Sequence, residues 1–352
     1  MINRKIVLSF IALLLIGAGI ISGLAYRALH EPVVLSTSPV SFEIQAGSSL
    51  RQVAVDLRNA GLIESIIPLV LYARITEQSG LIKAGEYHLV SGQSVIEMFA
   101  VFISGHVVQH AFTIVEGWTV SELLQALAVE PKIKHTLDEN LAPSLLTEHL
   151  GFSRQASEGL FFADTYFYAR NTSSEELLKR AYLRMQQVLS DEWAKRVKHL
   201  PYKNAYEALI MASIVEKETS VAREREAIAG VFVKRLKKGM RLQTDPSVIY
   251  GLGKDYKGNL TRKHLRTRTP YNTYRIAGLP PTPIALPGRE SIYASLHPRE
   301  NDALYFVAKG DGTHFFSENF KTHKAAVKRY QWKRRQDYRS TPLDSNTKAM
   351  NK

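Results

Sequence analysis

An uncharged run of 21 residues, Ile6 to Tyr26, stands near the N-terminus of the sequence. About 20 apolar residues are enough for a helix to cross the hydrocarbon core of a membrane. Arg4 and Lys5 precede the run, and basic residues favour the cytoplasmic side. We therefore expect residues 1–5 in the cytoplasm, a transmembrane helix over residues 6–26 and the remainder outside. The alternative, a signal peptide cleaved at Gly23-Leu24-Ala25, is disfavoured because signal cores span only about 7–15 residues.

Strand and helix patterns follow a polar spacer at residues 27–39. Apolar residues alternate at positions 40, 42 and 44, which predicts a strand, and Gly47 turns the chain. A serine pair then precedes a predicted helix whose apolar residues share one face: Leu50, Val53, Ala54 and Leu57. The apolar segment Ile66–Ile75 and a strand candidate, AGEYHLV, come next. We expect a small domain over residues 40–111.

One local pattern occurs three times, at Gly47-Ser48-Ser49-Leu50, Gly92-Gln93-Ser94-Val95 and Gly117-Trp118-Thr119-Val120. Each time a glycine follows a strand-like run, and a hydroxyl residue precedes a helix-like run. Glycine permits the turn, and the hydroxyl accepts a hydrogen bond from a free N–H group of the helix. A true sequence repeat and a common strand–turn–helix junction both explain the pattern, and the junction is the simpler explanation.

A larger mixed domain is expected over residues 112–335. Residues 173–176 suit a capping box that starts a helix reaching Trp193, a second helix carries SIVEKET, and a third spans residues 223–237. Residues 262–289 form a long loop rich in Pro, Gly, Tyr, Thr and Arg, and ALYFVAKGDGTHFFS predicts a β-hairpin. The polar tail, residues 336–352, is expected to fray. The predicted fold class is α+β.

Composition narrows the function. The 352 residues include no cysteine, which excludes disulfides, thiolate nucleophiles, thiolate metal sites and a lipid-modified N-terminal cysteine. The formal net charge of +13 suits nucleic acid, an anionic membrane surface or an acidic cell-wall polymer, but an exported chain argues against nucleic acid. The histidines lack metal-ligand spacing, and His314 is interpreted as structural or surface-exposed. With no P-loop, GxSxG elbow or dinucleotide fingerprint, we predict no metal and no cofactor.

The strongest candidate for chemistry is Glu218, in SIVEKET. At helical spacing its neighbours are all apolar: Ile210, Met211, Ile214, Val215, Val221 and Ala222. A carboxylic acid on such a stripe loses hydration, which raises its pKa and keeps it protonated, as a general acid requires. The alternative is a buried glutamate paired with Arg225 or Arg275. Glu216 has a small, polar flank and is expected to be solvated.

Polar and aromatic residues downstream are candidates for a substrate cleft. Gln243 and Asp245 stand just before Pro246, where Asp245 also suits the N-cap of a helix. Tyr271, Asn272 and Tyr274 follow in TPYNTY. Tyrosines stack on sugar rings and amides bond hydroxyl groups, as is typical of a glycan cleft, although rigid loop packing explains the same residues.

Several segments, in this order and spacing, carry a specific resemblance. They are IKAGEY, FTIVEGWT, EGLFFADTYFY, ASIVEKET, GMRLQTDPSVIYGLG, TPYNTY, GLPPTPIALPG and LYFVAKGDGTHFFS. Together they closely resemble the endolytic murein transglycosylases, the MltG or YceG-like family, from the membrane segment to about residue 332. Two positions depart from the family pattern, since Leu286 stands where Asn is common and Ala163 where Pro is usual.

The resemblance implies a single-pass protein of the cell inner membrane, with a cytoplasmic N-terminus and, in the periplasm, a LysM-like βααβ domain followed by a catalytic domain. It implies cleavage of nascent peptidoglycan strands between N-acetylmuramic acid and N-acetylglucosamine, leaving 1,6-anhydro ends that terminate elongation. The family's catalytic glutamate falls on Glu218 and its cleft motifs on Gln243, Asp245 and Asn272. Tyr271 and Tyr274 join them as expected substrate-binding residues, and peptidoglycan synthases (penicillin-binding proteins) are expected partners.

A single acid fits this chemistry. Hydrolytic glycosidases need two carboxylates, whereas a lytic transglycosylase needs one, because the C6 hydroxyl of the sugar itself attacks C1. The alternative function is a non-catalytic, membrane-anchored, peptidoglycan-binding adaptor. A periplasmic nucleic-acid binder rests on charge alone.

Overall fold

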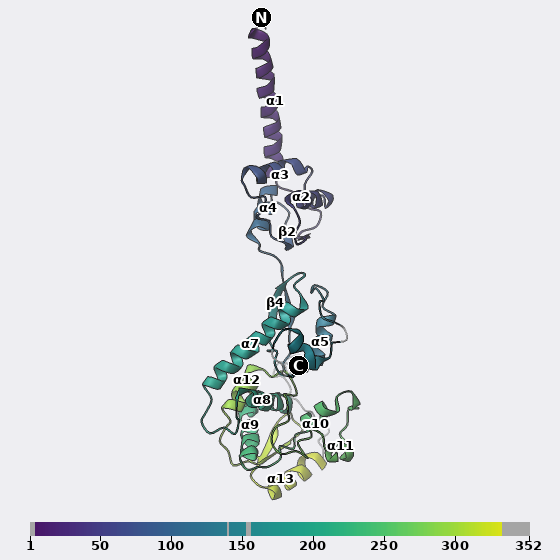
Figure 1. The fold of residues 1–352 in the computed structure, drawn as a ribbon, viewed down its shortest axis with the longest axis vertical. Coiled ribbons are helices and arrows are strands. Elements are labelled where there is room, and N and C mark those ends of the chain that lie inside the picture. The colour runs from purple at the N-terminus through teal and green to yellow at the C-terminus, as the bar shows by residue number, and fades with distance from the viewer. Residues whose placement is uncertain (1–3, 139–140, 153–155, 333–352) are drawn as a thin grey trace, which may run out of the picture. The chain divides into compact units, whose positions relative to one another are not determined.

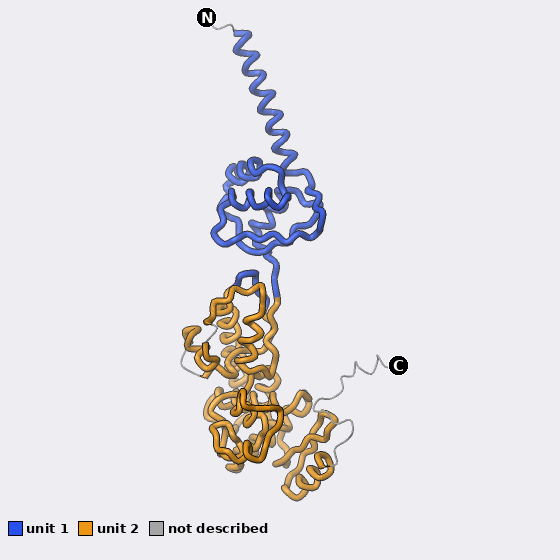
Figure 2. The backbone as a smooth tube through the Cα atoms, turned by 90° about the vertical axis from the view of Figure 1, so that its right-hand side faces the viewer, with its two compact units in different colours: residues 1–110, 167–172 blue, residues 111–166, 173–352 orange. Residues whose placement is uncertain are grey.

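The computed structural model describes residues 4–138, 141–152 and 156–332, and its fold is mixed α+β (Figure 1). The chain forms two compact units, coloured in Figure 2. The first comprises residues 1–110 and 167–172, and the second comprises residues 111–166 and 173–352. The sequence assigns residues 167–172 to the larger domain, whereas they pack with the first unit. The predicted polar tail lies outside the described residues.

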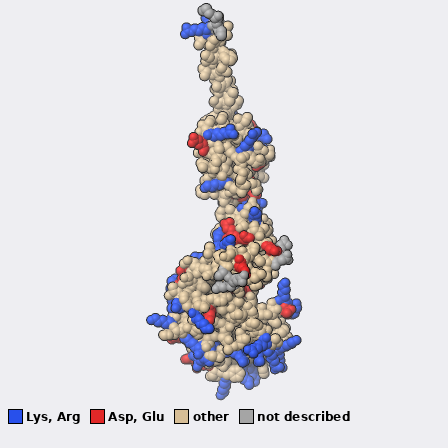
Figure 3. Space-filling view, in the orientation of Figure 1, with Lys and Arg blue, Asp and Glu red and all other residues tan. Residues whose placement is uncertain are grey.

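The apolar N-terminal run forms one uninterrupted helix, α1 (Arg4–His30). Among the described residues it is the one helix long and apolar enough to cross a membrane, and Figure 3 shows no charged side chain along its shaft. The helix is longer than predicted and includes residues 27–30 of the expected spacer. Two causes favour this end point: Leu29 is buried in the core of the first unit, and Pro32 disfavours helix at the residue before it.

The first unit has the predicted order of strand, helix, helix and strand. Strands β1 (Val40–Ile44) and β2 (Gly85–Leu89) pair antiparallel, with α2 (Leu50–Asn59) and α3 (Ile66–Ile75) between them in the chain and α4 (Val95–Ser104) after them. The predicted apolar face of α2 is buried, as expected. The core also takes in large side chains from both strands and from α4: Phe42, Tyr87, Phe99 and Phe102.

The three glycine–hydroxyl segments form the predicted junctions. Gly47, Gly92 and Gly117 have φ of 82°, 94° and 81°, a left-handed backbone that disfavours residues with a Cβ atom. The hydroxyl groups of three residues accept hydrogen bonds from backbone N–H groups in the first turns of α2, α4 and α5 (Val120–Ala128): Ser49, Ser94 and Thr119. Such caps stabilise a helix by about 1 kcal/mol each.

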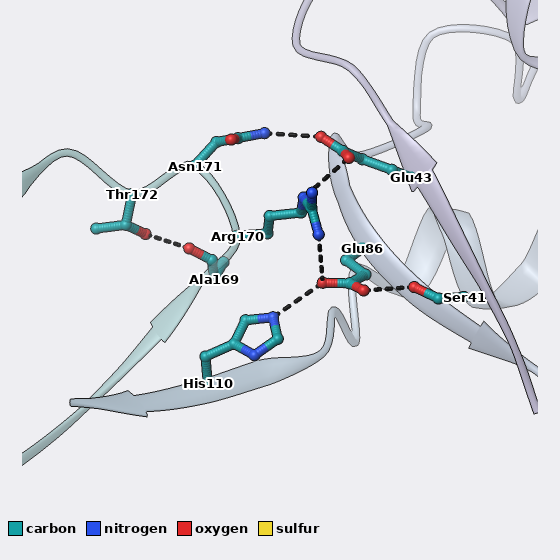
Figure 4. Close-up of polar contacts among 8 residues, drawn as sticks. All are labelled: Ser41, Glu43, Glu86, His110, Ala169, Arg170, Asn171 and Thr172. Carbon is teal, nitrogen blue, oxygen red and sulfur yellow. Dashed lines mark hydrogen bonds and ion pairs between the residues drawn. The ribbon is translucent and has the colours of Figure 1, made fainter. Parts of the chain in front are cut away.

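Polar contacts fasten residues 169–172 to the first unit (Figure 4). Arg170 Nε lies 2.9 Å from Glu43 Oε2, and its Nη1 lies 3.7 Å from Glu86 Oε2. Asn171 Nδ2 donates to Glu43 Oε1 at 2.7 Å, and His110 Nε2 lies 2.9 Å from Glu86 Oε2. These contacts join positions far apart in the sequence, which explains why the sequence pattern does not reveal them.

Helices build the core of the second unit. They are α7 (Ser174–Ala194), α8 (Ala205–Glu218), α9 (Ala222–Lys237) and α12 (Arg289–Leu296), and α12 contacts the other three. The predicted helix boundaries of α7 and α9 agree within a residue. Helix α8 is buried on all sides over residues 208–215. It therefore has no solvent face along this stretch.

Smaller elements complete the second unit. Strands β5 (Tyr305–Ala308) and β6 (His314–Ser317) pair antiparallel as the predicted hairpin, with Ala308 opposite His314. The others are α6 (Leu146–His149), α10 (Asp245–Leu252), α11 (Arg262–Arg266) and α13 (Phe320–Val327), with short 3-10 turns at Pro143–Leu145 and Gly253–Asp255 and a π-turn at Lys328–Trp332. Strands β3 (Gln109–Thr113) and β4 (Thr165–Ala169) form another two-stranded sheet, and each strand has residues in both units.

The proline-rich loop packs against α8. Ser213 Oγ on α8 accepts a hydrogen bond from the Ile284 N–H at 3.0 Å. Gly159 supports the same loop from another segment: its φ is 80°, and a Cβ atom there would lie 2.4 Å from Cβ of Pro283. Only glycine fits this close approach. The loop is thereby held rigidly beside the C-terminal turns of α8.

Candidate active site

Glu218 is the last residue of α8, and the chain leaves the helix at Thr219. The sequence places it in the middle of an apolar stripe that continues to Val221 and Ala222. This prediction is wrong, because Val221 is the N-cap and Ala222 the first residue of α9. Helix α8 is buried on all sides over residues 208–215, but Glu218 itself faces polar side chains across a cavity. The expected rise of its pKa through loss of hydration is nevertheless present.

Glu218 opens onto a cavity of about 550 Å³. This volume lies within the roughly 300–1,000 Å³ of ordinary ligand sites. The cavity wall is built from the end of α8, α9, residues 242–245, Tyr274, the β5–β6 hairpin and α13. Four of the six predicted site residues meet there: Glu218, Gln243, Asp245 and Tyr274.

The surroundings of Glu218 tune its acidity. Burial raises the pKa of its carboxyl group to about 7, the nearby Asp245 adds to the rise, and a hydrogen bond from Thr244 together with the charge of Arg235 lowers it. The side chain is still half-buried, so it keeps access to the cavity. A carboxyl group with a pKa near neutrality can give up a proton and take one back in the same turnover.

Thr244 is the closest polar partner of Glu218, and the sequence analysis missed its role. Its Oγ1 donates a hydrogen bond to Glu218 Oε1. The Thr244 N–H donates to Thr273 Oγ1 at 3.0 Å, and Ser247 Oγ donates to the Thr244 carbonyl at 2.9 Å. Thr244, Ser247 and Thr273 are all buried. This network fixes the hydroxyl group that faces the acid.

Replacing Thr244 with valine should move the alkaline limb of the pH–rate profile upward, by on the order of one pH unit. The hydroxyl stabilises the ionised form of Glu218, so its loss raises the pKa of the carboxyl group. Because the acid must be protonated to act, activity then persists to higher pH. The measurement is kcat/KM for glycan cleavage against pH, with Thr244→Ser as the control that keeps the hydroxyl. An unchanged limb in Thr244→Val would contradict this assignment.

Asp245 lies beside the acid but does not cap α10. Thr244 occupies the N-cap position, and Asp245 is the first helical residue, so the predicted cap is displaced by one position. The Asp245 carboxylate is exposed in the cavity, and its Oδ1 accepts a hydrogen bond from the Tyr274 hydroxyl at 2.7 Å. This pairing orients both side chains at the cavity wall.

Gln243 adopts a left-handed backbone, with φ of 53°. This conformation costs a residue with a Cβ atom on the order of 1 kcal/mol, and such strain is concentrated at functional sites. The exposed Gln243 side chain lines the cavity, between the buried Leu242 and Thr244.

Tyr271 and Asn272 do not line this cavity in the described part of the chain. Asn272 is fully buried, and its Nδ2 donates to the carbonyls of His264 and Thr267, at 3.0 and 2.6 Å. Its Oδ1 accepts from the Tyr274 N–H at 3.0 Å. Tyr271 donates to or accepts from Thr282 Oγ1 at 2.8 Å. Both residues brace the loop that carries Tyr274.

Glu216 is not solvated, which corrects the sequence-based expectation. Its side chain is 7% exposed, accepts the Gly288 N–H at 3.0 Å and lies 3.7 Å from Arg225 Nη2. Arg225 also pairs with Glu116 and Glu290. Arg225, one of the two arginines considered as partners for Glu218, therefore pairs with Glu216 instead, and this cluster ties α8 to α9 and to the start of α12.

The sequence did not identify several residues of the cavity wall as site residues: Arg235, Tyr305, His314 and His323. His314 is anchored by Glu224, whose carboxylate accepts the His314 backbone N–H at 3.1 Å and lies 2.8 Å from its Nδ1. It thus has the structural role that the sequence favoured and also faces the cavity. These residues come from α9, the hairpin and α13, so no spacing pattern links them to Glu218.

Glu158 is a second buried acid, distinct from the cavity. Burial raises its pKa to about 7, and its carboxylate accepts hydrogen bonds from the Val120 N–H at 3.1 Å and the Tyr250 hydroxyl at 3.1 Å. Among the residues that the structure describes, Glu158 does not line the Glu218 cavity.

No metal site is visible in the described part of the chain, since it includes no cluster of three His, Cys, Asp or Glu side chains that could hold a metal ion.

Leu286, at the position where the family commonly has Asn, is fully buried. Its backbone N–H donates to the Trp118 carbonyl at 2.6 Å, and its carbonyl accepts the Gly117 N–H at 2.8 Å. The backbone bonds hold the loop in place, and the side chain contributes packing only.

The family of the chain follows from comparison with known proteins. A family model described as the YceG-like family matches residues 42–329, and the chain belongs to this family. The resemblance seen in the motifs is thereby confirmed.

Named relatives agree with this assignment. A Bacillus subtilis (strain 168) protein named endolytic murein transglycosylase is 34% identical over 337 residues, covering 90% of this chain and 91% of that protein. A Streptococcus pneumoniae serotype 2 (strain D39 / NCTC 7466) protein of the same name is 28% identical, covering 92% of this chain and 65% of that protein. A 2.6 Å crystal structure of a yceG-like protein from Listeria monocytogenes matches with a TM-score of 0.53 and 29% identity, over 82% of this chain and 99% of that one.

Proposed function

We propose that this chain is an endolytic lytic transglycosylase. It cleaves nascent peptidoglycan between N-acetylmuramic acid and N-acetylglucosamine and leaves 1,6-anhydro ends that terminate strand elongation. The observation that carries the proposal is Glu218, an acid with a pKa of about 7 that opens onto a cavity of about 550 Å³. Membership of the YceG-like family and the names of the relatives support it.

The reaction needs one acid and no water. Protonated Glu218 gives its proton to the glycosidic oxygen, and the bond from that oxygen to C1 of the muramyl residue breaks. The C6 hydroxyl of the same muramyl residue attacks C1 and closes the 1,6-anhydro ring. The Glu218 carboxylate takes the proton of that hydroxyl, so the acid is restored and no atom is gained or lost overall.

Gln243, Asp245 and Tyr274 are the substrate-binding residues of this proposal, because they line the cavity with Glu218. Amide, carboxylate and phenol groups bond sugar hydroxyls, and a tyrosine ring also packs on a sugar face. Asn272 and Tyr271 do not contact the substrate in this proposal, because their polar side-chain atoms form hydrogen bonds to other residues of the protein. They support the loop that carries Tyr274.

The domains follow the same proposal. Residues 40–111 form a LysM-like domain that binds glycan, supported by the strand–helix–helix–strand order and the antiparallel β1–β2 pair. Residues 112–335 form the catalytic domain, except for residues 167–172, which pack with the first unit. Helix α1 is a single-pass inner-membrane anchor, with residues 1–5 cytoplasmic and the catalytic domain periplasmic, where peptidoglycan synthases are partners.

The test is the release of soluble glycan fragments from purified sacculi by the full chain in detergent. A transglycosylase releases fragments of mixed length early in the reaction, because it cuts within strands. A non-catalytic adaptor binds the sacculi and sediments with them but releases nothing, which would overturn the proposal.

A further inference from the structure

Arg235 is a buried cation in the wall of the Glu218 cavity. It stands on α9, is 6% exposed, and its side chain lines the same cavity as the acid. No Asp or Glu oxygen lies within 4.0 Å of its guanidinium among the residues that the structure describes. Its positive charge is therefore not balanced by a contacting carboxylate.

Neutral groups hold this charge in place. Arg235 Nε donates to the Leu304 carbonyl at 2.7 Å, and Nη1 donates to the Leu242 carbonyl at 2.5 Å. The guanidinium carbon lies 5.1 Å from the centre of the Tyr305 ring, within the range of a cation–π contact. These contacts fix the guanidinium relative to the segment that carries Leu242 and to the start of the β5–β6 hairpin.

A buried charge of this kind is costly, because it gives up hydration without gaining a carboxylate partner. Burial accordingly lowers the pKa of Arg235, while the proximity of Glu218 counteracts that change. A neutral hydrogen-bond donor would be enough to bond the two backbone carbonyls. These hydrogen bonds alone therefore do not explain why a charged side chain is buried at this position. The charge is explained if it acts on an anion that forms in the cavity.

Glu218 is the group on which that charge acts. The other charged or titratable groups lining the cavity come from each element around the acid: Asp245 of α10, Tyr274 of the following loop, Tyr305 of β5, His314 of β6 and His323 of α13. His314 is tied to Glu224, and the Tyr274 hydroxyl to Asp245. Arg235 is thus the one permanently charged cation among the described residues of the wall.

We propose that Arg235 is a positioning residue whose buried positive charge stabilises the Glu218 carboxylate once the acid has given its proton to the glycosidic oxygen. This inference rests on the proposed function. It identifies Arg235 as the group that allows the desolvated Glu218 to release its proton. Preorganised charges that face a developing anion lower its energy most in sites shielded from water.

The charge and the carbonyl bonds can be separated by substitution. Arg235→Gln and Arg235→Met remove the charge, and Arg235→Lys keeps it. Lys237→Gln is the matched control, because it removes a positive charge from an exposed position of the same helix. The measurements are the thermal midpoint of each variant and the pH dependence of kcat and kcat/KM for release of glycan from sacculi.

Both neutral variants should lower kcat by roughly ten- to a hundredfold, because the anion loses its stabilising charge. Their alkaline limb should move upward by roughly half a pH unit or more, since Glu218 then holds its proton more tightly. Arg235→Lys and Lys237→Gln should keep the wild-type limb. Folded neutral variants with an unmoved limb would show that Arg235 is only structural and overturn the proposal.

If neither neutral variant folds, Arg235→Lys decides the question. A folded lysine enzyme with the wild-type limb supports the role of the charge, and a limb moved upward contradicts it, because the charge is still present. Failure of the proposed function is a separate outcome, recognised when the wild-type protein releases no glycan at any pH.

Discussion

Glu218→Gln is expected to reduce glycan cleavage about a thousandfold or more while leaving the fold intact. Proton transfer by a positioned acid contributes roughly 10²–10⁴ to such a reaction, and an amide of the same shape cannot transfer the proton. The variant should still bind sacculi, because the cavity walls and the first unit are unchanged. Release of soluble muropeptides from sacculi, with sedimentation as the binding assay, measures both.

Glu216→Gln is the matched control, two positions away on the same helix. Its buried carboxylate contacts Arg225 and the Gly288 N–H, so its loss should lower the thermal midpoint and leave the activity of the folded molecules largely unchanged. Equal losses of activity in both variants at normal stability would contradict the choice of Glu218.

Glu218→Gln should also change how the stability of the protein depends on pH. Burial raises the folded-state pKa of Glu218 from 4.5 to about 7, so the folded protein binds this proton more tightly than the unfolded chain does. The stabilisation is complete below pH 4.5 and is lost as the pH rises through 7. Glutamine stays neutral, so above that pH the variant should be more stable than the wild type, by at most about 3 kcal/mol.

Removal of residues 1–26 is expected to convert a protein that pellets with membranes into one that stays in the supernatant. The deletion removes most of α1 but keeps Leu29, which packs in the core of the first unit. The truncated protein should therefore still fold. Carbonate-washed membranes, probed for the full chain and for the deletion, provide the measurement.

Membrane orientation is tested with the same chain. A C-terminal reporter that is active only outside the cytoplasm should function, as Arg4 and Lys5 before the span predict. Quantitative recovery of a shortened soluble form beginning near Tyr26 would instead identify a cleaved signal peptide, and an inactive reporter would reverse the orientation.

The buried face of an amphipathic helix could be predicted from the sequence. The surroundings of a helix that is buried on all sides could not. The four buried residues of α2 were predicted because a small unit buries one side of each helix and leaves the other polar. Helix α8 is buried on all sides over residues 208–215, so its apolar residues do not show which face of the helix points to the core. The predicted apolar stripe therefore placed the wrong neighbours around Glu218. Glu218 as the catalytic acid remains a prediction, which the sequence suggested because its neighbours at helical spacing are apolar.

The rest of the site depends on contacts between distant segments. Thr244 and Asp245 both suit an N-cap before Pro246, and only the backbone shows that Thr244 takes the cap and turns its hydroxyl to Glu218. Glu216 was expected to be solvated, because the sequence did not show Arg225 and the Gly288 N–H beside it. Arg235 and His314 reach the cavity through tertiary packing, for which local periodicity carries no information.

The central claim is that the reaction is an intramolecular transfer with one acid. Because the C6 hydroxyl is tethered and well oriented, its attack has an activation barrier about 7–11 kcal/mol lower than attack by a free reactant. This difference favours the C6 hydroxyl over water as the nucleophile in a desolvated site. Digestion of sacculi in ¹⁸O-labelled water, followed by borohydride treatment and mass spectrometry of the glycan ends, tests this claim most directly. The account predicts 1,6-anhydro-muramic ends that carry no label and resist reduction. Labelled ends that reduce with borohydride would contradict it, and would identify a hydrolase with Asp245 as the first candidate for a second carboxylate.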